Sequence, residues 1–206
     1  MKKLFHLLTF LAFFIPSCQN APKDGMMKDD QATDETQHEK LTLGGGCYWC
    51  LEAIFQQLEG VISATSGFMG GHVPNPTYEE VTDGGTGHIE VIQVVYDPAL
   101  ISTADLLAWF WKAHDPTNPL GQGADIGERY TSNIFTHSEE QKKIAEASKK
   151  AAQADFSKLI VTRILNAEEF YKAKEDHQDY YFRKKNENRY CPAVIKPKLK
   201  KLNLDY

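Results

Sequence analysis

The stretch LTLGGGCYWC, residues 41–50, runs three glycines into a cysteine that is followed by two aromatic residues and a second cysteine. Residues 40–45 have the pattern of a short strand that ends in glycine. Beyond Cys47 the apolar residues recur with the spacing of a helix, at Leu51, Ile54, Phe55 and Leu58. Cys47 is therefore predicted to lie on a strand-to-helix turn. A thiol in that position can be a nucleophile, half of a redox pair, a metal ligand or a core residue.

The composition is that of an ordinary globular protein. The 206 residues are 42% hydrophobic and 25% charged, which suits one well-packed domain. The formal net charge of −5 provides no broad basic surface for the phosphates of nucleic acid. We therefore expect a monomeric domain that does not bind nucleic acid.

Residues 1–18 differ in composition from the rest of the chain. Two lysines precede the apolar run LFHLLTFLAFFI, which resembles the core of a signal peptide and is too short to span a bilayer comfortably. The run ends in IPSC, where Ser17 before Cys18 resembles the lipobox of a bacterial lipoprotein, although Pro16 departs from that pattern. We expect an exported protein, anchored by a lipid on Cys18 to the periplasmic face or the outer membrane. Ordinary secretion without lipidation is the alternative.

Residues 19–39 contain hardly any large apolar side chains, so they cannot bury enough surface to offset the entropy of ordering. We predict a flexible tether there and one catalytic domain over residues 40–206. That domain contains three cysteines, Cys47, Cys50 and Cys191. An odd count in an exported protein favours a reactive thiol over a purely structural disulfide framework.

Strand and helix signals follow one another along the domain. Helices are predicted to begin at Ser102 and Ser138, because each serine opens a capping pattern. The Pro- and Gly-rich segment 115–132 is too long for a simple connection and is predicted to be a packed, functional loop. The element order predicts an α+β fold, a ferredoxin-like plait with a mainly antiparallel sheet covered by helices and a long C-terminal coil. Further strands are predicted over residues 61–71, 88–96 and 159–165.

The position of Cys47 favours reactivity. The thiolate is the nucleophilic form, and free N–H groups at a helix N-terminus stabilise its charge. Tyr48 and Trp49 stand where short polar residues are usual, so they either form an apolar wall beside the thiol, suited to a methyl group, or seal the edge of the core. An inert, buried Cys47 in a glycine-rich turn is the alternative.

Glu90 lies on the predicted strand 88–96, on the same face as Ile92, Val94 and Tyr96. An apolar environment raises the pKa of a carboxyl, so Glu90 can keep its proton at neutral pH and act as a general acid. The residue pattern leaves open an exposed carboxylate at the start of the strand.

Six segments of the chain together resemble the A-type peptide methionine sulfoxide reductases: GGGCYWC, GFMGGHVPNPTYEEV, TGHIEVIQVVYDP, FWKAHDPT, GQGADIGERYTS and NENRYC. The likeness runs from about residue 41 to about residue 200. The usual GCFWG or GCFWC of that family has Tyr48 here in place of phenylalanine. Its usual AEDYHQ has Asp176 here in place of the tyrosine, followed by His177, which we expect to be structural.

The resemblance implies thiol-dependent reduction of methionine S-sulfoxide, free or in proteins, and therefore repair of oxidised proteins of the cell envelope. It implies that Cys47 attacks the sulfoxide sulfur. Tyr48 and Trp49 would hold the S-methyl group, and Glu90 would protonate the sulfoxide oxygen.

The resemblance also assigns three residues that bind substrate. Tyr78 and Tyr130 would donate hydrogen bonds to the sulfoxide oxygen, and Asp125 would position the substrate backbone or its waters. The sulfenic acid left on Cys47 would condense with a second thiol, and a thioredoxin-like donor would reduce the disulfide. No metal or organic cofactor is implied.

Two thiols compete for the resolving role. Cys50 lies one helical turn from Cys47, and a strain-free disulfide there is available only in the first turn of a helix. Cys191 precedes Pro192 in a segment with the composition of a mobile coil, and family members of this kind place a resolving thiol after a tyrosine in the C-terminal coil. We predict Cys47–Cys191 as the first disulfide, with Cys50 as the alternative or a later relay.

Two other functions agree with single features of the sequence. A thioredoxin-like dithiol oxidoreductase would use Cys47 and Cys50 as its CxxC pair, but it leaves Glu90 and the aromatic residues unexplained. A binding module would hold structural zinc through the three cysteines and a histidine, for which one CxxC and a distant cysteine are a weak signal.

Overall fold

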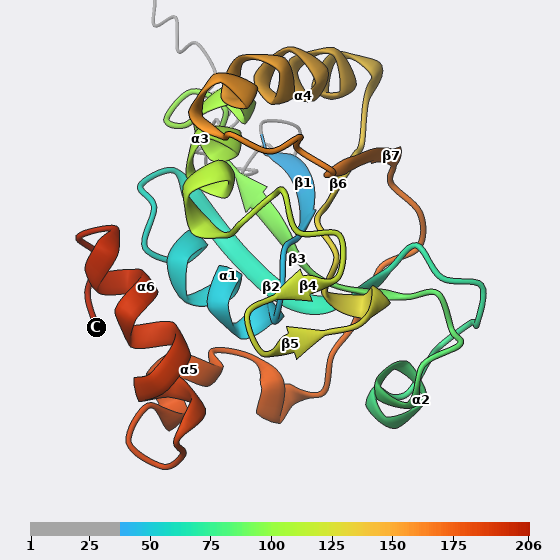
Figure 1. Cartoon of the computed structure of the whole chain (residues 1–206), viewed down its shortest axis with the longest axis vertical. Helices are drawn as coiled ribbons and strands as arrows, with labels where there is room; N and C mark the ends of the chain where they lie inside the picture. Colours follow the sequence, from blue (N-terminus) through green and yellow to red (C-terminus); the bar gives the residue numbers. More distant parts are fainter. Residues whose placement is uncertain (1–37) are drawn as a thin grey trace, which may run out of the picture. The chain divides into compact units, whose positions relative to one another are not determined.

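The computed structural model describes residues 38–206, and its centre is a six-stranded sheet (Figure 1). The strand order is β7-β6-β1-β3-β2-β8. Neighbouring strands are antiparallel except β6 and β7, which are parallel and connected through α4. The strands are β1 (Glu39–Gly44), β2 (Val61–Met69), β3 (Ile89–Tyr96), β6 (Asn133–Thr136), β7 (Arg163–Asn166) and β8 (Tyr171–Lys172), with a separate hairpin of β4 (Gly121–Gln122) and β5 (Asp125–Ile126).

The helices begin where the sequence places their caps. Ser102 accepts the N–H of Asp105 at the start of α3, and Ser138 accepts the N–H of Gln141 at the start of α4, so both predicted start signals are confirmed. α1 packs on β2 and β3, and α3 packs on α4. The helices are α1 (Tyr48–Phe55), α2 (Tyr78–Asp83), α3 (Thr103–Ala113), α4 (Glu139–Ala152), α5 (Tyr180–Lys184) and α6 (Lys196–Lys201), with 3-10 helices at Glu128–Tyr130, Gln153–Asp155 and Glu175–His177 and a π-helical turn at Cys191–Ile195.

The sheet is buried on both faces. Leu41 lies opposite Val94 in the β1–β3 ladder, and both side chains are fully buried in the main core. Ile89 and Val91 of β3 belong to a smaller cluster on the other face, together with Met69 and Phe135. Because side chains alternate along a strand, Glu90 faces the main core, on the same side as Val94.

The mixed α+β class and the mainly antiparallel sheet agree with the sequence prediction. The same sheet contradicts the thioredoxin-like alternative, which needs a parallel βαβ unit at its start. Here α1 connects β1 and β2, but β3 lies between them and pairs antiparallel with both.

The predicted C-terminal coil is wrong, because the segment is largely helical. α5, the π-helical turn Cys191–Ile195 and α6 lie beside α1 (Figure 1). Pro192 stands in the first turn of its helical segment, where the missing N–H has no intrahelical partner to lose. Ile195 and Leu199 are fully buried, so packing against the core favours a helix over the extended chain that Pro192 suggests.

The predicted signal peptide, with Cys18, and nearly all of the predicted tether lie outside the described residues. β1 begins at Glu39, so the folded domain starts one residue earlier than predicted. Within residues 38–206, no helix combines the length and the apolar character that crossing a membrane requires.

Candidate active site

Cys47 lies where β1 ends and α1 begins, as the glycine run predicts. We call residues 44–50 the thiol turn. Gly46 has a φ of +91°, which favours glycine, and a Cβ there would lie 2.7 Å from Cγ of Gln122. The N–H of Gly46 donates to the carbonyl of Tyr130 at 3.1 Å. The thiol turn thus packs directly on the segment 115–132, and that contact requires a glycine.

The thiol of Cys47 is almost inaccessible, with 6% of the residue exposed. Burial raises the pKa of Cys47 well above its usual value, and the neighbouring Cys50 and Glu90 raise it further. The helix N-terminus does not offset this, because the first amide of α1, that of Tyr48, donates to Oε2 of Glu90 at 3.2 Å. Burial and Glu90 thus oppose the expected stabilisation of a Cys47 thiolate by the N–H groups of the helix N-terminus.

Glu90 is a buried carboxyl beside that thiol. It is 2% exposed, and burial raises its pKa to about 8, so it keeps its proton at neutral pH. Nε of Arg129 lies 3.9 Å from Oε1 and favours the carboxylate, but burial prevails. The alternative of an exposed carboxylate at a strand end is excluded.

Tyr130 and Arg129 form the side of the site that comes from the segment 115–132. The guanidinium of Arg129 lies over the ring of Tyr130, 4.4 Å from its centroid, and Nη1 donates to the carbonyl of Thr82 at 2.8 Å. Burial raises the pKa of Tyr130 to about 12, and Glu90 adds to the shift. The hydroxyl of Tyr130 therefore remains a hydrogen-bond donor at neutral pH.

Tyr48 is buried next to Cys47, with 1% of the residue exposed. Its hydroxyl is 2.5 Å from Nδ1 of His177. This contact gives the buried hydroxyl the partner that it needs, which explains why tyrosine fits where the family usually has phenylalanine. Burial raises the pKa of Tyr48, and four more ionisable groups lie near enough to act on it: Glu90, Cys47, Tyr78 and Tyr130.

Trp49 completes an aromatic wall beside Cys47. Its ring stacks on that of Tyr180, with centroids 3.6 Å apart and planes 8° from parallel. Tyr190 approaches the same indole edge-on at 6.0 Å. Tyr78, the first residue of α2, meets His177 edge-on at 4.7 Å on the other side of the wall. These rings form an aromatic cluster next to the thiol turn, and Tyr180 and Tyr190 in it come from the C-terminal part of the chain.

Tyr190 links the segment 115–132 to the thiols. Its hydroxyl donates to Oδ2 of Asp125 at 2.7 Å and lies 3.8 Å from Sγ of Cys50. Cys50 is fully buried and lies within hydrogen-bonding reach of the Cys47 thiol, whose hydrogen bond lowers the pKa of Cys50. Cys50 lies in the first turn of α1, so its position one turn after Cys47 keeps the two thiols close together.

Cys191 is held in place rather than carried on a mobile coil. The residue is fully buried, and its N–H donates to Oδ1 of Asn188 at 2.9 Å. Burial raises the pKa of its thiol, and Cys50 is near enough to raise it further. All three cysteines of the described domain are free thiols.

The structure brings every predicted site residue of the domain to one place, and it adds four that the sequence analysis did not assign to the site. Arg129 and Tyr190 adjoin predicted residues within the quoted segments GQGADIGERYTS and NENRYC, which is a signal that could have found them. His177 follows the Asp176 departure from the family pattern. Tyr180 gives no signal in the sequence, because its role depends on stacking with Trp49.

The arrangement combines a thiol, a carboxyl that keeps its proton and a phenol donor between apolar walls. It suits attack of sulfur on a soft electrophilic atom while the carboxyl protonates an oxygen bound to that atom. Within residues 38–206, no three His, Cys, Asp or Glu side chains gather as metal ligands would, so the zinc alternative has no candidate site there.

A family model described as peptide methionine sulfoxide reductase matches residues 39–205. Two peptide methionine sulfoxide reductases MsrA, from Sulfolobus acidocaldarius and Thermus thermophilus, are 50% and 49% identical to the chain over 163 residues, which is 79% of this chain and 92% of each relative.

Two solved structures agree with this match. Methionine sulfoxide reductase A of Corynebacterium diphtheriae has a TM-score of 0.68 at 37% identity and covers 78% of this chain and 80% of its own. Mxr1 from Saccharomyces cerevisiae in its reduced form has a TM-score of 0.72 at 30% identity and covers 77% and 92%. The chain belongs to the peptide methionine sulfoxide reductase family, and it is an MsrA-type enzyme that reduces methionine sulfoxide.

Proposed function

We propose that the enzyme reduces the S epimer of methionine sulfoxide, free or in proteins, with Cys47 as nucleophile and Glu90 as general acid. The observation that carries this assignment is the buried Glu90 carboxyl, which keeps its proton beside the thiol and bonds the first amide of α1. The sulfur of Cys47 attacks the sulfoxide sulfur, and the sulfoxide oxygen takes the proton of Glu90. The thiol proton of Cys47 passes to the carboxylate left on Glu90. The S–O bond breaks as the oxygen moves to the Cys47 sulfur, and the bond between the two sulfurs breaks, which gives methionine and a sulfenic acid on Cys47.

The remaining site residues bind and orient the sulfoxide. Tyr78 and Tyr130 donate hydrogen bonds to its oxygen, which gains charge as the S–O bond breaks. Tyr48 and Trp49 contact the S-methyl group, and Asp125 positions the substrate backbone or its waters. Support comes from the burial of Tyr48 and the proton that Tyr130 retains at neutral pH.

Separately resolved epimers of methionine sulfoxide test this assignment in the presence of dithiothreitol. The S epimer should yield methionine and the R epimer none, since separate enzymes serve the two epimers. Equal rates on both would contradict the specificity, and no methionine from either would contradict the reaction itself.

We propose that Cys191 resolves the sulfenic acid. Its thiol attacks the sulfenic sulfur of Cys47, which forms a disulfide and releases water, and a thioredoxin-like donor then reduces the disulfide. A solved complex of yeast Mxr1 with Trx2, at 25% identity and a TM-score of 0.52, is consistent with such a donor. Cys50 is the alternative resolving thiol, and its proximity to Cys47 would allow a route in which Cys50 reacts first and passes the disulfide to Cys191.

Peptide mapping after one turnover without reductant separates the two routes. A Cys47–Cys191 bridge is expected. A Cys47–Cys50 bridge in the wild type, or undiminished thioredoxin-dependent turnover in Cys191→Ser, would show that Cys50 resolves the sulfenic acid.

We further propose that the enzyme is exported, lipidated on Cys18 and held at the cell envelope, where it repairs oxidised proteins. The support is the signal-peptide-like segment 1–18 with its IPSC lipobox resemblance. Wild-type protein should partition into the membrane fraction and into detergent, whereas Cys18→Ala should be released or fail to mature. A wholly soluble wild type would contradict the anchor and leave the enzymatic assignment intact.

We also propose that the core of the fold is a ferredoxin-like plait and that the enzyme acts as a monomer. Its support is the strand order β6-β1-β3-β2 with α1 after β1 and α3 after β3, the arrangement of a split βαβ repeat. Every proposed site residue of the domain comes from one chain, so a monomer is sufficient. Sedimentation of the active protein as a dimer would contradict the second claim.

A further inference from the structure

Glu52 is a buried carboxyl that the proposed reaction does not use. It lies in α1 on the side of the C-terminal helices and is 1% exposed. Its Oε2 accepts the N–H of Tyr180 at 3.1 Å, while its Oε1 has no hydrogen-bond partner among the described residues. Burial raises the pKa of Glu52 to about 7, and the amides of Tyr180 and Asp179 oppose that shift. Burying a carboxyl with one unpaired oxygen costs free energy of folding. Its bond to the C-terminal chain therefore suggests a function for this residue.

The backbone that Glu52 holds is strained. Asp179 has a left-handed conformation, with φ 51° and ψ 29°, which is unfavourable for a residue other than glycine. Its own side chain does not cap α5. Instead, Nε2 of Gln56, the residue that caps the C-terminus of α1, donates to Oδ1 of Asp179 at 2.5 Å. A side chain of α1 and the side chain of its C-cap residue therefore fix the residues at which the chain turns into α5.

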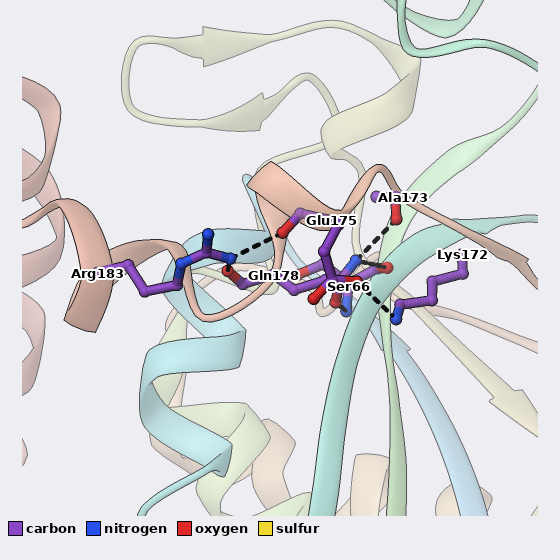
Figure 2. A network of polar contacts seen from close by, with 6 residues as sticks. All are labelled: Ser66, Lys172, Ala173, Glu175, Gln178 and Arg183. Carbon is purple, nitrogen blue, oxygen red and sulfur yellow. Dashed lines mark hydrogen bonds and ion pairs between the residues drawn. The ribbon is translucent and has the colours of Figure 1, made fainter.

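The chain before this point is attached to the sheet, independently of α1. Oε1 of Gln178 accepts the N–H of Ser66 in β2, and its Nε2 donates to the carbonyls of Ser66 and Ala173, all at 3.0 Å. Figure 2 shows this amide lying along β2, with Arg183 reaching back to the carbonyls of Glu175 and Gln178. Gln178 is thus anchored to β2, so we expect any displacement of the C-terminal chain to begin after Gln178.

We call residues 179–206 the C-terminal arm. Its first contact with the site is the stack of Tyr180 on Trp49. Further along, Tyr190 bonds Asp125, and Cys191 is buried near Cys50. Glu52 holds the arm at its first residues, so the positions of the tyrosines and of Cys191 depend on that bond.

We propose that Glu52 is a positioning residue that docks the C-terminal arm on α1 and thereby sets the rate at which Cys191 reaches the oxidised Cys47. The inference rests on the proposed role of Cys191 in recycling. Whether the Cys191 sulfur attacks the Cys47 sulfenic acid, with loss of water, or a Cys47–Cys50 disulfide, with loss of a thiol, it must approach from the docked arm.

The test compares two steps of one turnover without reductant: formation of methionine and formation of the Cys191 disulfide, followed by rapid alkylation and mass spectrometry. Glu52→Leu removes the acceptor for the buried Tyr180 N–H and should slow the disulfide step on the order of tenfold relative to methionine formation. Glu52→Gln keeps a carbonyl oxygen for that N–H and should restore the ratio. Glu59→Gln, which removes the same charge from an exposed position just after α1, is the matched control.

Gln56→Ala covers the case in which Glu52→Leu does not fold. It removes the bond from Gln56 to the Asp179 side chain at a half-buried position and should also slow the disulfide step, by a few-fold. A wild-type ratio in folded Glu52→Leu, or a Glu52→Gln variant as slow as Glu52→Leu, would overturn the proposal. So would an unchanged ratio in Gln56→Ala when Glu52→Leu is unfolded.

Failure of the proposed function would appear differently, as absence of methionine in every variant and the wild type. Docking of the arm would then be scored by hydrogen exchange at the amide of Tyr180. That amide should exchange at least tenfold faster in Glu52→Leu, or in Gln56→Ala if the first variant is unfolded, than in Glu59→Gln. Equal exchange would overturn the proposal without reference to catalysis.

Discussion

The thiol turn and the C-terminal arm each bring a cysteine to the site, but different kinds of contact hold them. The thiol turn begins at the last residue of β1, and β1 pairs with β3 on one side and β6 on the other. Backbone hydrogen bonds of the sheet therefore fix the position of Cys47. The arm touches the same site through side chains, among them the Tyr180 stack and the Tyr190–Asp125 bond.

The difference fits what each cysteine is proposed to do. A nucleophile needs a fixed geometry, which a central strand supplies. A resolving thiol has to approach and leave, and an element that packs on the core through side chains alone can open without unfolding the sheet. Changes at the thiol turn should therefore affect the chemical step, whereas changes in the arm should affect recycling.

The largest effect is expected at the thiol turn. Cys47→Ser removes the nucleophile but leaves a residue that is favoured at a helix N-cap, so α1 should form as before. No methionine should appear from methionine sulfoxide with dithiothreitol, while the melting temperature stays close to that of the wild type. Turnover above the reagent background would place the nucleophile elsewhere.

The next effect concerns the acid beside that thiol. Glu90→Gln keeps the shape but has no proton to transfer, so kcat/KM should fall on the order of 10²–10⁴-fold. In the wild type, kcat/KM should fall as pH rises through about 8, because the carboxyl then loses its proton. The variant should lack this decline. A loss of less than a few-fold would return Glu90 to a structural role.

A smaller effect is expected in the packing behind the thiol turn. The imidazole of His114 is buried, with Nδ1 2.8 Å from the carbonyl of Phe110 and Nε2 2.7 Å from Oγ of Ser132. Burial lowers the pKa of His114 to about 4, so the folded protein holds it neutral. Its stabilising contribution is present above pH 6.5 and is lost as pH falls towards 4, where unfolding lets it gain a proton.

The free energy of unfolding should therefore lose about 3 kcal/mol between pH 6.5 and 4 through this one group. Glu90 and Glu52, whose raised pKa values favour the folded state at low pH, act in the opposite direction. Denaturant titrations at pH 6.5 and pH 4 give the change in the free energy of unfolding between the two pH values, for the wild type and for His114→Gln. The difference between these two changes is the contribution of the histidine. Equal changes in the two proteins would contradict the prediction.

The smallest effect is expected in the arm. Tyr190→Phe removes the bond to Asp125, which is worth about 1 kcal/mol, and keeps the ring against Trp49. Thioredoxin-dependent turnover should change by a few-fold, whereas methionine formed in the first turnover should be nearly unchanged. If the first turnover falls by more than recycling does, the arm serves the chemical step and the division between the two regions fails.

The same division explains what the sequence could predict. The strand and helix around Cys47 follow from local periodicity, and the face of Glu90 follows from the two-residue period of β3. The arm does not, because its structure depends on distant partners: Glu52 and Tyr180 are 128 residues apart. Locally, Pro192 predicts extended chain, and only the burial of Ile195 and Leu199 makes the segment helical. The proximity of Cys50 to Cys47 also depends on how α1 begins, which the sequence does not show.

The burial of Cys47 also bears on how the enzyme tolerates oxidants. Hydrogen peroxide reacts with accessible thiolates, whereas burial raises the pKa of Cys47 and leaves only 6% of the residue exposed. A sulfoxide differs from peroxide, because it carries a methyl group that the proposed aromatic wall would hold and an oxygen that Glu90 is proposed to protonate. Burial of Cys47 thus favours reaction with a bound sulfoxide over reaction with peroxide. We therefore expect Cys47 to resist irreversible oxidation under conditions that oxidise methionine.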